Sequence, residues 1–208
     1  MRFTPAQSDT LAALRQLSAK ETFLGKDAYT RLCREQEIVE EKEQAALLGL
    51  LDSLGLVLHF EKIAGLSAYL LNPRWLTYGV YEVLNKKQSH VNQQDAIAWL
   101  RQAQVWDNLG NPMDYPAERC GFLLDAMESF QVAYRLPPPP GGAPTFVIPS
   151  LFPTDEPAFD FPEQEARAFR FRFPGLIPPH LLPRLIVARH ADIEEQGGEP
   201  LAWRSGWC

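Results

Sequence analysis

No stretch of the sequence approaches the ~18 consecutive apolar residues that a membrane-spanning helix requires. The first ten residues, MRFTPAQSDT, contain no apolar segment of the kind that forms the centre of a secretory signal peptide. The cysteines are few, odd in number and far apart, at Cys33, Cys120 and Cys208, so a disulfide framework is not expected. Together these absences predict a cytoplasmic protein without a membrane span.

Positive charge is also in short supply. Lys and Arg number 20 against 26 Asp and Glu, which gives a formal net charge of −6. A helix expected over residues 40–54 has Lys42 as its single basic residue, and four of its residues are acidic: Glu40, Glu41, Glu43 and Asp52. Nucleic-acid binding depends on neutralising phosphates with Lys and Arg, so such a helix would be repelled by DNA. We therefore expect no nucleic-acid partner.

Motifs that would indicate catalysis, a cofactor or a metal are missing. The nearest approach to a phosphate-binding loop is FLGKDAY, where Asp27 follows Gly25-Lys26 and the upstream glycine is lacking. The four histidines form no H-E-x-x-H, and the sequence has neither C-x-x-C nor G-x-S-x-G. We expect no catalytic, cofactor-binding or metal-binding residues, and hence a protein that is not an enzyme.

Proline divides the chain into parts of different character. Of the 18 prolines, 14 follow residue 136, and the junction PPPPGGAP (137–144) has the composition of a linker, with a PxxP ligand as the alternative. The predicted division is a first domain at 1–136, a proline-rich and acidic connector at 137–165 with a strand at 145–151, and a second domain at 166–208. The predicted fold class is α+β: a winged-helix-like, mostly helical first subdomain and the start of a mixed α/β second one.

Hydrophobic periodicity predicts the elements of the first domain. The expected helices cover residues 9–17, 27–33, 41–55 and 74–84. Before the last of these, LVLHF (56–60) and AYLLNP (68–73) predict two short strands, the second ending at Pro73. This order of helix, strand, loop and strand is the outline of a winged-helix unit.

A second winged-helix unit is expected farther along the chain. Its helices would cover residues 92–106 and 116–130, and TFVIPSLF would supply a strand. The two predicted units share no clear residue-level repeat.

The second domain begins with an alternating pattern. In ARAFRFRFP, phenylalanines at 169, 171 and 173 alternate with arginines at 170 and 172, which predicts a half-buried strand. A helix is expected over 178–193, and LAWRSGWC (201–208) predicts a last strand whose sheet partners lie outside this chain. Five arginines and no acidic residue lie between Arg167 and Arg189, which indicates either solvated faces or a docking surface for an acidic partner.

Four segments, in order, resemble one family. LGLVLHF…AYLLNPRWLTYGVYEVL resembles the first subdomain of the COR domain, the region C-terminal to the Roc GTPase in Roco proteins, and FVIPSLFP is similar to a stretch that follows it there. FRFRFPGLIPPHLLPRLIVARH and AWRSGW resemble the opening of the second COR subdomain. The resemblance covers about residues 25 to 208. It lacks the Roc domain and stops at the W-R-x-G strand, so a COR domain truncated within its second subdomain is expected.

The resemblance implies a non-catalytic dimerisation and relay module. Such a module would pack against a Roc GTPase domain of the same parent chain and couple its nucleotide state to dimerisation, as a homodimer when the second subdomain is complete. Two alternatives stay open: a winged-helix adaptor of a STAND-type NTPase, and a winged-helix nucleic-acid regulator. The interface candidates that follow are Phe171, Arg172, Phe173, Arg184, Trp75, Tyr78, Tyr81, Trp203 and Trp207, and for each the alternative is packing in the core.

Overall fold

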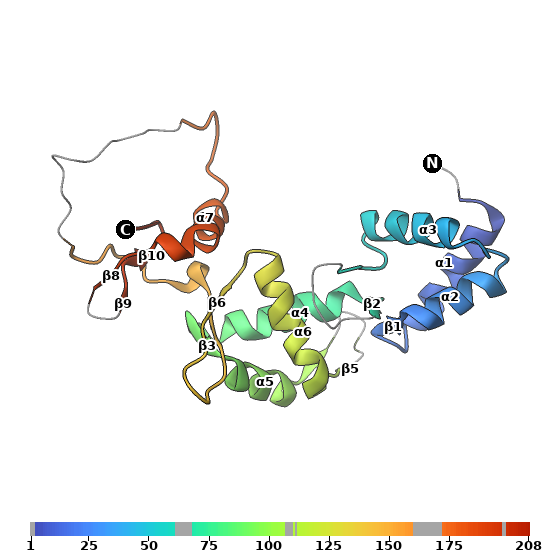
Figure 1. The fold of residues 1–208 in the computed structure, drawn as a ribbon, viewed down its shortest axis with the longest axis horizontal. Coiled ribbons are helices and arrows are strands. Elements are labelled where there is room, and N and C mark those ends of the chain that lie inside the picture. The colour runs from blue at the N-terminus through green and yellow to red at the C-terminus, as the bar shows by residue number, and fades with distance from the viewer. Residues whose placement is uncertain (1–2, 61–67, 107–109, 111, 160–171, 197–198) are drawn as a thin grey trace. The chain divides into compact units, whose positions relative to one another are not determined.

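The computed structural model describes residues 3–60, 68–106, 110, 112–159, 172–196 and 199–208 (Figure 1). The chain forms two compact units: unit 1 consists of Met1–Glu82 and Ala103–Leu123, and unit 2 of Val83–Gln102 and Leu124–Cys208. Helices combine with short antiparallel strands in both units, so the fold is mixed and consistent with the α+β class. Helices α4 (Pro73–Asn85) and α6 (Ala117–Ser129) contribute residues to both units.

Unit 1 begins with three helices at the positions that the periodicity predicted. They are α1 (Pro5–Ser18), α2 (Lys26–Glu35) and α3 (Glu41–Ser53). A capping box starts α1: the Thr4 hydroxyl accepts from the Gln7 amide at 3.2 Å, and the Gln7 side chain accepts from the Thr4 amide at 3.0 Å. Of the apolar stripe predicted for α3, Leu47, Leu48 and Leu51 are buried, whereas Leu54 at the C-cap is 53% exposed.

Two short antiparallel ladders complete unit 1. β1 (Phe23–Gly25) pairs with β2 (Ala68–Leu70), and β4 (Val105–Trp106) pairs with β5 (Pro112–Met113). The predicted strand at 56–60 is reduced to a single bridge between Leu58 and Leu70.

The predicted helix 92–106 was too long, because α5 (Gln93–Gln102) ends before Val105 and Trp106, whose β-branched and aromatic side chains suit a strand.

A three-stranded antiparallel sheet forms the centre of unit 2. Its order is β3 (His90–Asn92), β7 (Thr145–Val147) and β6 (Tyr134–Leu136). The predicted linker 137–144 is here the loop of the β6–β7 hairpin, because Leu136 and Thr145 are paired neighbours. Proline and glycine suit a hairpin loop as well as a linker, so composition alone could not distinguish the two.

The strand predicted for 145–151 ends early. β7 stops at Val147, and a 3₁₀ turn, η1 (Pro149–Leu151), follows. The reason is Pro149, which cannot donate a hydrogen bond to a sheet.

Toward the C-terminus, unit 2 contains one more helix and two small hairpins. They are α7 (Leu181–Arg189), followed by η2 (His190–Asp192), then β8 (Glu195–Gln196) with β9 (Glu199–Pro200), and β10 (Ala202–Trp203) with β11 (Gly206–Trp207). The helix predicted for 178–193 is therefore shorter. Of the alternating strand expected at 166–174, residues 166–171 lie outside the described residues, and residues 172–174 are not in a strand.

The last segment was predicted as one strand, and this was wrong. Ala202 pairs with Trp207 and Trp203 with Gly206, so the chain reverses at Arg204-Ser205. Gly206 permits the tight turn, since a Cβ there would lie 2.4 Å from Cζ2 of Trp203. The hairpin does not leave Trp207 unpacked: it lies against a core cluster that includes Tyr134, Phe152 and Ile186.

Candidate interaction surfaces

Three aromatic residues of α4 were predicted as interface candidates, and they differ in exposure. Trp75 is buried at 1% exposure, Tyr78 is half-buried, and Tyr81 is 57% exposed. Trp75 packs in the core of unit 1, which was the alternative that the sequence left open. Of the three, Tyr81 offers the largest surface to a partner.

Several contacts hold Trp75 in place. Its Nε1 donates a hydrogen bond of 2.8 Å to the backbone oxygen of Asp114, and its ring stacks on Tyr115 with centroids 4.9 Å apart. The rings of Phe23 and Phe122 also lie near it, at 5.1 and 6.3 Å. An indole bonded and enclosed in this way is a structural residue of its own unit.

Arg184 lies on the exposed face of α7. Its Nε and Nη2 both donate to Oε1 of Gln131, at 3.1 and 2.8 Å, while the neighbouring Ile186 and Val187 are buried. These bonds hold the guanidinium at the surface. Because the amide of Gln131 is neutral, they do not neutralise the positive charge of Arg184. This arrangement suits a carboxylate on a partner.

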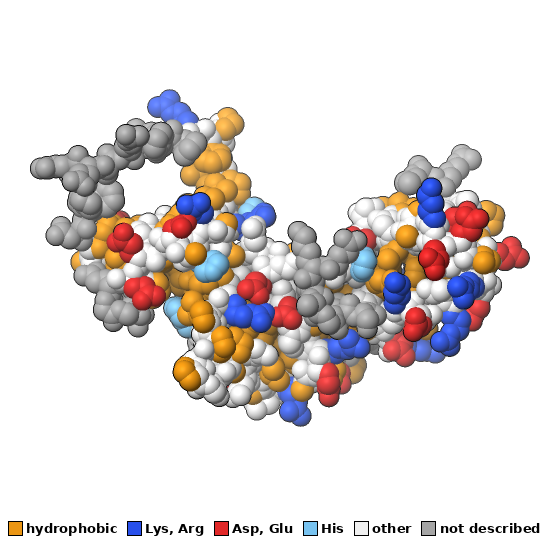
Figure 2. Space-filling view, in the orientation of Figure 1, with side chains coloured by type: hydrophobic (Ala, Val, Ile, Leu, Met, Phe, Trp, Pro, Cys, Tyr) orange, Lys and Arg blue, Asp and Glu red, His pale blue; other side chains and the backbone are white. Residues whose placement is uncertain are grey.

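The segment that leads into α7 is exposed throughout residues 172–180. It carries Arg172 and three large apolar side chains: Phe173 at 45% exposure, Leu176 at 99% and Ile177 at 54%. Figure 2 shows the hydrophobic side chains of this segment as an orange column above α7. Phe171, also predicted, lies outside the described residues.

Leu176 and Ile177 were missed by the sequence analysis. The sequence does contain a signal for them: after the alternating phenylalanines and arginines, these two large apolar residues follow Phe173 before any charged residue occurs. Leu185 on α7, which is 40% exposed, is a further large apolar side chain at the surface of the described part of unit 2.

The hairpin with Trp203 and Trp207 is anchored rather than open. The guanidinium of Arg204 donates to the Ser150 carbonyl at 3.2 and 3.0 Å, and its amide donates to the Pro153 carbonyl at 2.8 Å. Both tryptophans are half-buried. Their accessible edges remain available, but the hairpin's place on η1 is fixed by these bonds.

The titratable groups with shifted pKa values in the described residues are tyrosines and cysteines. No three His, Cys, Asp or Glu side chains in the described ranges gather closely enough to hold a metal ion. The shifted groups reflect burial: burial raises the pKa of Tyr134 to about 12 and also raises the pKa of the Cys33 thiol.

Among the described residues, no helix is long and apolar enough to cross a membrane.

One arginine of unit 2, Arg135, forms ion pairs with two carboxylates of the same helix. Arg135 of β6 pairs with Asp125, and with Glu128 at 3.0 Å, both on α6, and its guanidinium lies 4.9 Å from the ring centroid of Phe146. These contacts tie the β6–β7 hairpin to α6. They leave Arg135 a structural role rather than a free binding group.

Comparison with known proteins gives consistent matches. Residues 8–152 match the family model described as C-terminal of Roc, COR-A domain. The chain is 29% identical over 164 residues to the probable serine/threonine-protein kinase pats1 of Dictyostelium discoideum, covering 72% of this chain and 5% of that protein. It is 24% identical over 160 residues to a Roc-COR-CHAT protease of an unknown prokaryotic organism, covering 75% of this chain and 14% of that protein.

A solved structure is similar in fold. The structure of Methanosarcina barkeri Roco2 RocCORdC bound to GDP matches with a TM-score of 0.56 at 24% identity, covering 72% of this chain and 44% of that one. The chain therefore spans less than half the length of each of these relatives.

Proposed function

Because the chain belongs to the COR-A domain family of Roco proteins, we propose that it is a non-catalytic relay module that packs against a Roc GTPase domain and couples the nucleotide state of that domain to dimerisation. The match over residues 8–152 carries this proposal. The names of the matched proteins support it, since one is a Roc-COR protein and another is a RocCOR structure bound to GDP.

The finer fold assignment is part of the proposal: two winged-helix units in sequence. Its support is a shared order of elements, which is α1, β1, α2, α3, the Leu58 bridge and β2 in the first case. In the second it is α4, β3, α5, α6, β6 and β7, with the small β4–β5 hairpin inserted between α5 and α6. In both, the strand that comes last in sequence is the central one, pairing with both of the others.

The surface that we assign to the Roc domain consists of Arg172, Phe173 and Arg184, with Leu176 and Ile177 beside them in sequence. The apolar side chains supply buried area, and the arginines supply pairing with acidic groups. Trp203 and Trp207 are assigned to the dimer contact, and Tyr81 is a second, weaker candidate for contact with the Roc domain. Trp75 acts indirectly, by fixing the start of α4 through its bond to Asp114, and Tyr78 of the same helix is half-buried.

The test is association of this chain with the Roc domain of its parent protein, measured by analytical ultracentrifugation with GDP and with a non-hydrolysable GTP analogue. We expect a complex whose affinity differs between the nucleotides, and Arg184→Glu should weaken it at least ~tenfold. Arg101→Glu, an exposed arginine on α5, makes the same charge change away from the assigned surface and should leave the affinity unchanged.

Two results would count against the proposal. The absence of any complex with either nucleotide would leave the adaptor of a STAND-type NTPase as the better hypothesis. Equal losses for Arg184→Glu and Arg101→Glu would show that net charge, and not the assigned surface, controls binding. Solution mass across a concentration series, with and without the Roc domain, separates dimerisation from Roc binding.

A further inference from the structure

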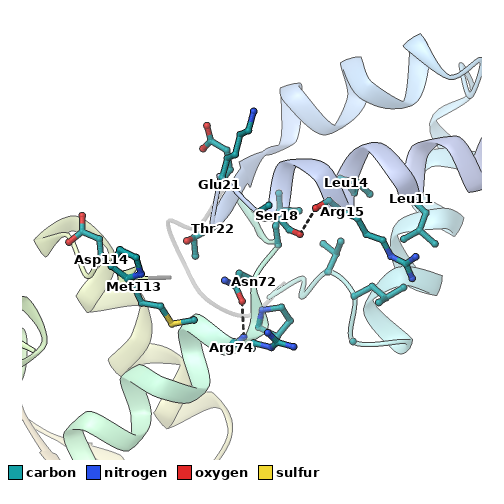
Figure 3. A pocket seen from close by; sticks show the side chains of 18 residues that line it. Leu11, Leu14, Arg15, Ser18, Glu21, Thr22, Asn72, Arg74, Met113 and Asp114 are labelled. Atoms are coloured by element: carbon teal, nitrogen blue, oxygen red, sulfur yellow. Dashed lines mark hydrogen bonds between the residues drawn. The ribbon is translucent and has the colours of Figure 1, made fainter. Parts of the chain in front are cut away.

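Unit 1 contains a pocket of about 640 Å³ to which the function proposed above gives no role (Figure 3). It is bounded by the second half of α1 and the residues after it, by the turn that follows α3, by the junction of β2 and α4, and by β5. All of its lining residues belong to unit 1. Its volume lies within the ~300–1,000 Å³ that small-molecule sites occupy.

The floor of the pocket is apolar and firmly packed. Leu14, Val57 and Leu71 are each at most 3% exposed and belong to one core cluster, while Met113 of β5 is 9% exposed. A hydrogen bond of 2.8 Å from the Leu71 amide to the Thr22 carbonyl joins two of the bounding segments. Such a floor is formed before any ligand arrives and favours the apolar part of one.

The rim carries charges of both signs: the cations Arg15, Lys20 and Arg74, and the anions Glu21 and Asp114. In Figure 3, Arg15 lies on the same side of Asn72 as Leu11 and Leu14, and Arg74 lies directly below Asn72. The carboxylates of Glu21 and Asp114, which also line the pocket, point away from that side. Among the described residues Arg15 makes no ion pair.

We propose that this pocket binds a small molecule with an apolar body and an anionic head group. The body lies against Leu14, Val57 and Met113, and the head pairs with the guanidinium of Arg15. A carboxylate or sulfonate is the fitting head, because guanidinium offers two parallel N–H donors to such a group. A cationic molecule of the same shape should bind more weakly, because Arg15 would repel its head group.

The test uses 8-anilino-1-naphthalenesulfonate, an aromatic sulfonate whose fluorescence rises on binding. We expect saturable binding to the full chain, which Arg15→Glu weakens by at least ~fivefold. Arg31→Glu on α2 is the matched control, since Arg31 is exposed and does not line the pocket. Dodecanoate should displace the dye, and dodecyltrimethylammonium, with the same alkyl chain and the opposite charge, should not.

Location needs a separate measurement, because the dye can also bind the exposed apolar segment before α7. Dodecanoate should shift the amide resonances of Thr22, Gly55 and Leu71, and the double substitution Leu176→Ser, Ile177→Ser should leave dye binding intact. The proposal is overturned if Arg15→Glu and Arg31→Glu lose affinity equally, if the cation displaces as well as the anion, or if the double substitution abolishes binding.

Discussion

The hydroxyl of Tyr115 donates a hydrogen bond of 2.8 Å to the backbone carbonyl of Trp75, a residue forty positions earlier, and the two rings stack 4.9 Å apart. Trp75 in turn donates its indole Nε1–H to the carbonyl of Asp114, the residue before Tyr115. The first turn of α4 and the segment before α6 are therefore joined by one buried hydrogen bond, one partly buried hydrogen bond and one ring contact. This pairing fixes the shape of unit 1 beside the pocket.

Tyr115→Phe tests the contribution of the hydroxyl. The ring contact survives, but the Trp75 carbonyl loses a buried partner, so the free energy of unfolding should fall by about 1–2 kcal/mol. Urea denaturation followed by tryptophan fluorescence measures the change. Tyr81→Phe removes an exposed hydroxyl from the same helix and should alter stability by less than about 0.5 kcal/mol. Equal effects of the two substitutions would mean that the buried bond contributes nothing specific.

Gly79 of α4 allows this close packing. A Cβ at that position would lie 2.1 Å from Cδ1 of Leu123 and 2.7 Å from Cε1 of Tyr115. Gly79→Ala should therefore destabilise the chain by about 1–3 kcal/mol, although alanine is the better helix former.

The matched control for this substitution is Gly49→Ala in the middle of α3, where a Cβ would meet nothing within 4 Å. It should stabilise the chain by about 0.5–1 kcal/mol, because glycine loses more backbone entropy on folding than alanine. Thermal unfolding followed by circular dichroism measures both variants. A neutral or stabilising Gly79→Ala would show that Leu123 and Tyr115 move aside at little cost.

The residues that the sequence placed correctly are those governed by short-range rules. The stripes of α1, α3 and α4 follow a helical period. Leu47, Leu48 and Leu51 of α3 are buried as that period requires, and Leu54, where the helix ends, is exposed. The alternating phenylalanines also followed a simple pattern, yet residues 172–174 are not in a strand, since alternation does not supply a partner strand.

Features that depend on contacts between distant segments could not be predicted. β1 has three residues, too few to show alternation, and it forms only because residues 68–70 lie beside it. The loop 137–144 has the composition of a linker, and its role as a hairpin loop depends on the pairing of Leu136 with Thr145. The pocket likewise combines Arg15, Val57 and Met113 from separate segments, and no local pattern connects them.

Tyr134 of β6 predicts how unit 2 responds to alkali. Burial raises its pKa to about 12 from the ordinary value of 10.0. Between these two pH values the unfolded chain releases the phenolic proton of Tyr134 while the folded chain keeps it. Releasing the proton therefore favours the unfolded chain. The contribution of Tyr134 to the free energy of unfolding is fully present below pH 10 and is progressively lost as the pH rises toward 12. At ~1.4 kcal/mol per pH unit, the expected loss is about 2–3 kcal/mol.

Other buried tyrosines titrate in the same direction, because burial also raises the pKa of Tyr29 and Tyr115. The measurement is therefore a difference: urea denaturation of the parent chain and of Tyr134→Phe at pH 8, 9, 10 and 11. The two curves of stability against pH should run parallel up to pH 9, and above it the parent chain should lose stability faster, since phenylalanine has no proton to release. Parallel curves up to pH 11 would mean that the Tyr134 hydroxyl reaches solvent in the folded chain, and the packing of α7 and the β10–β11 hairpin around it would then be looser than the buried cluster indicates.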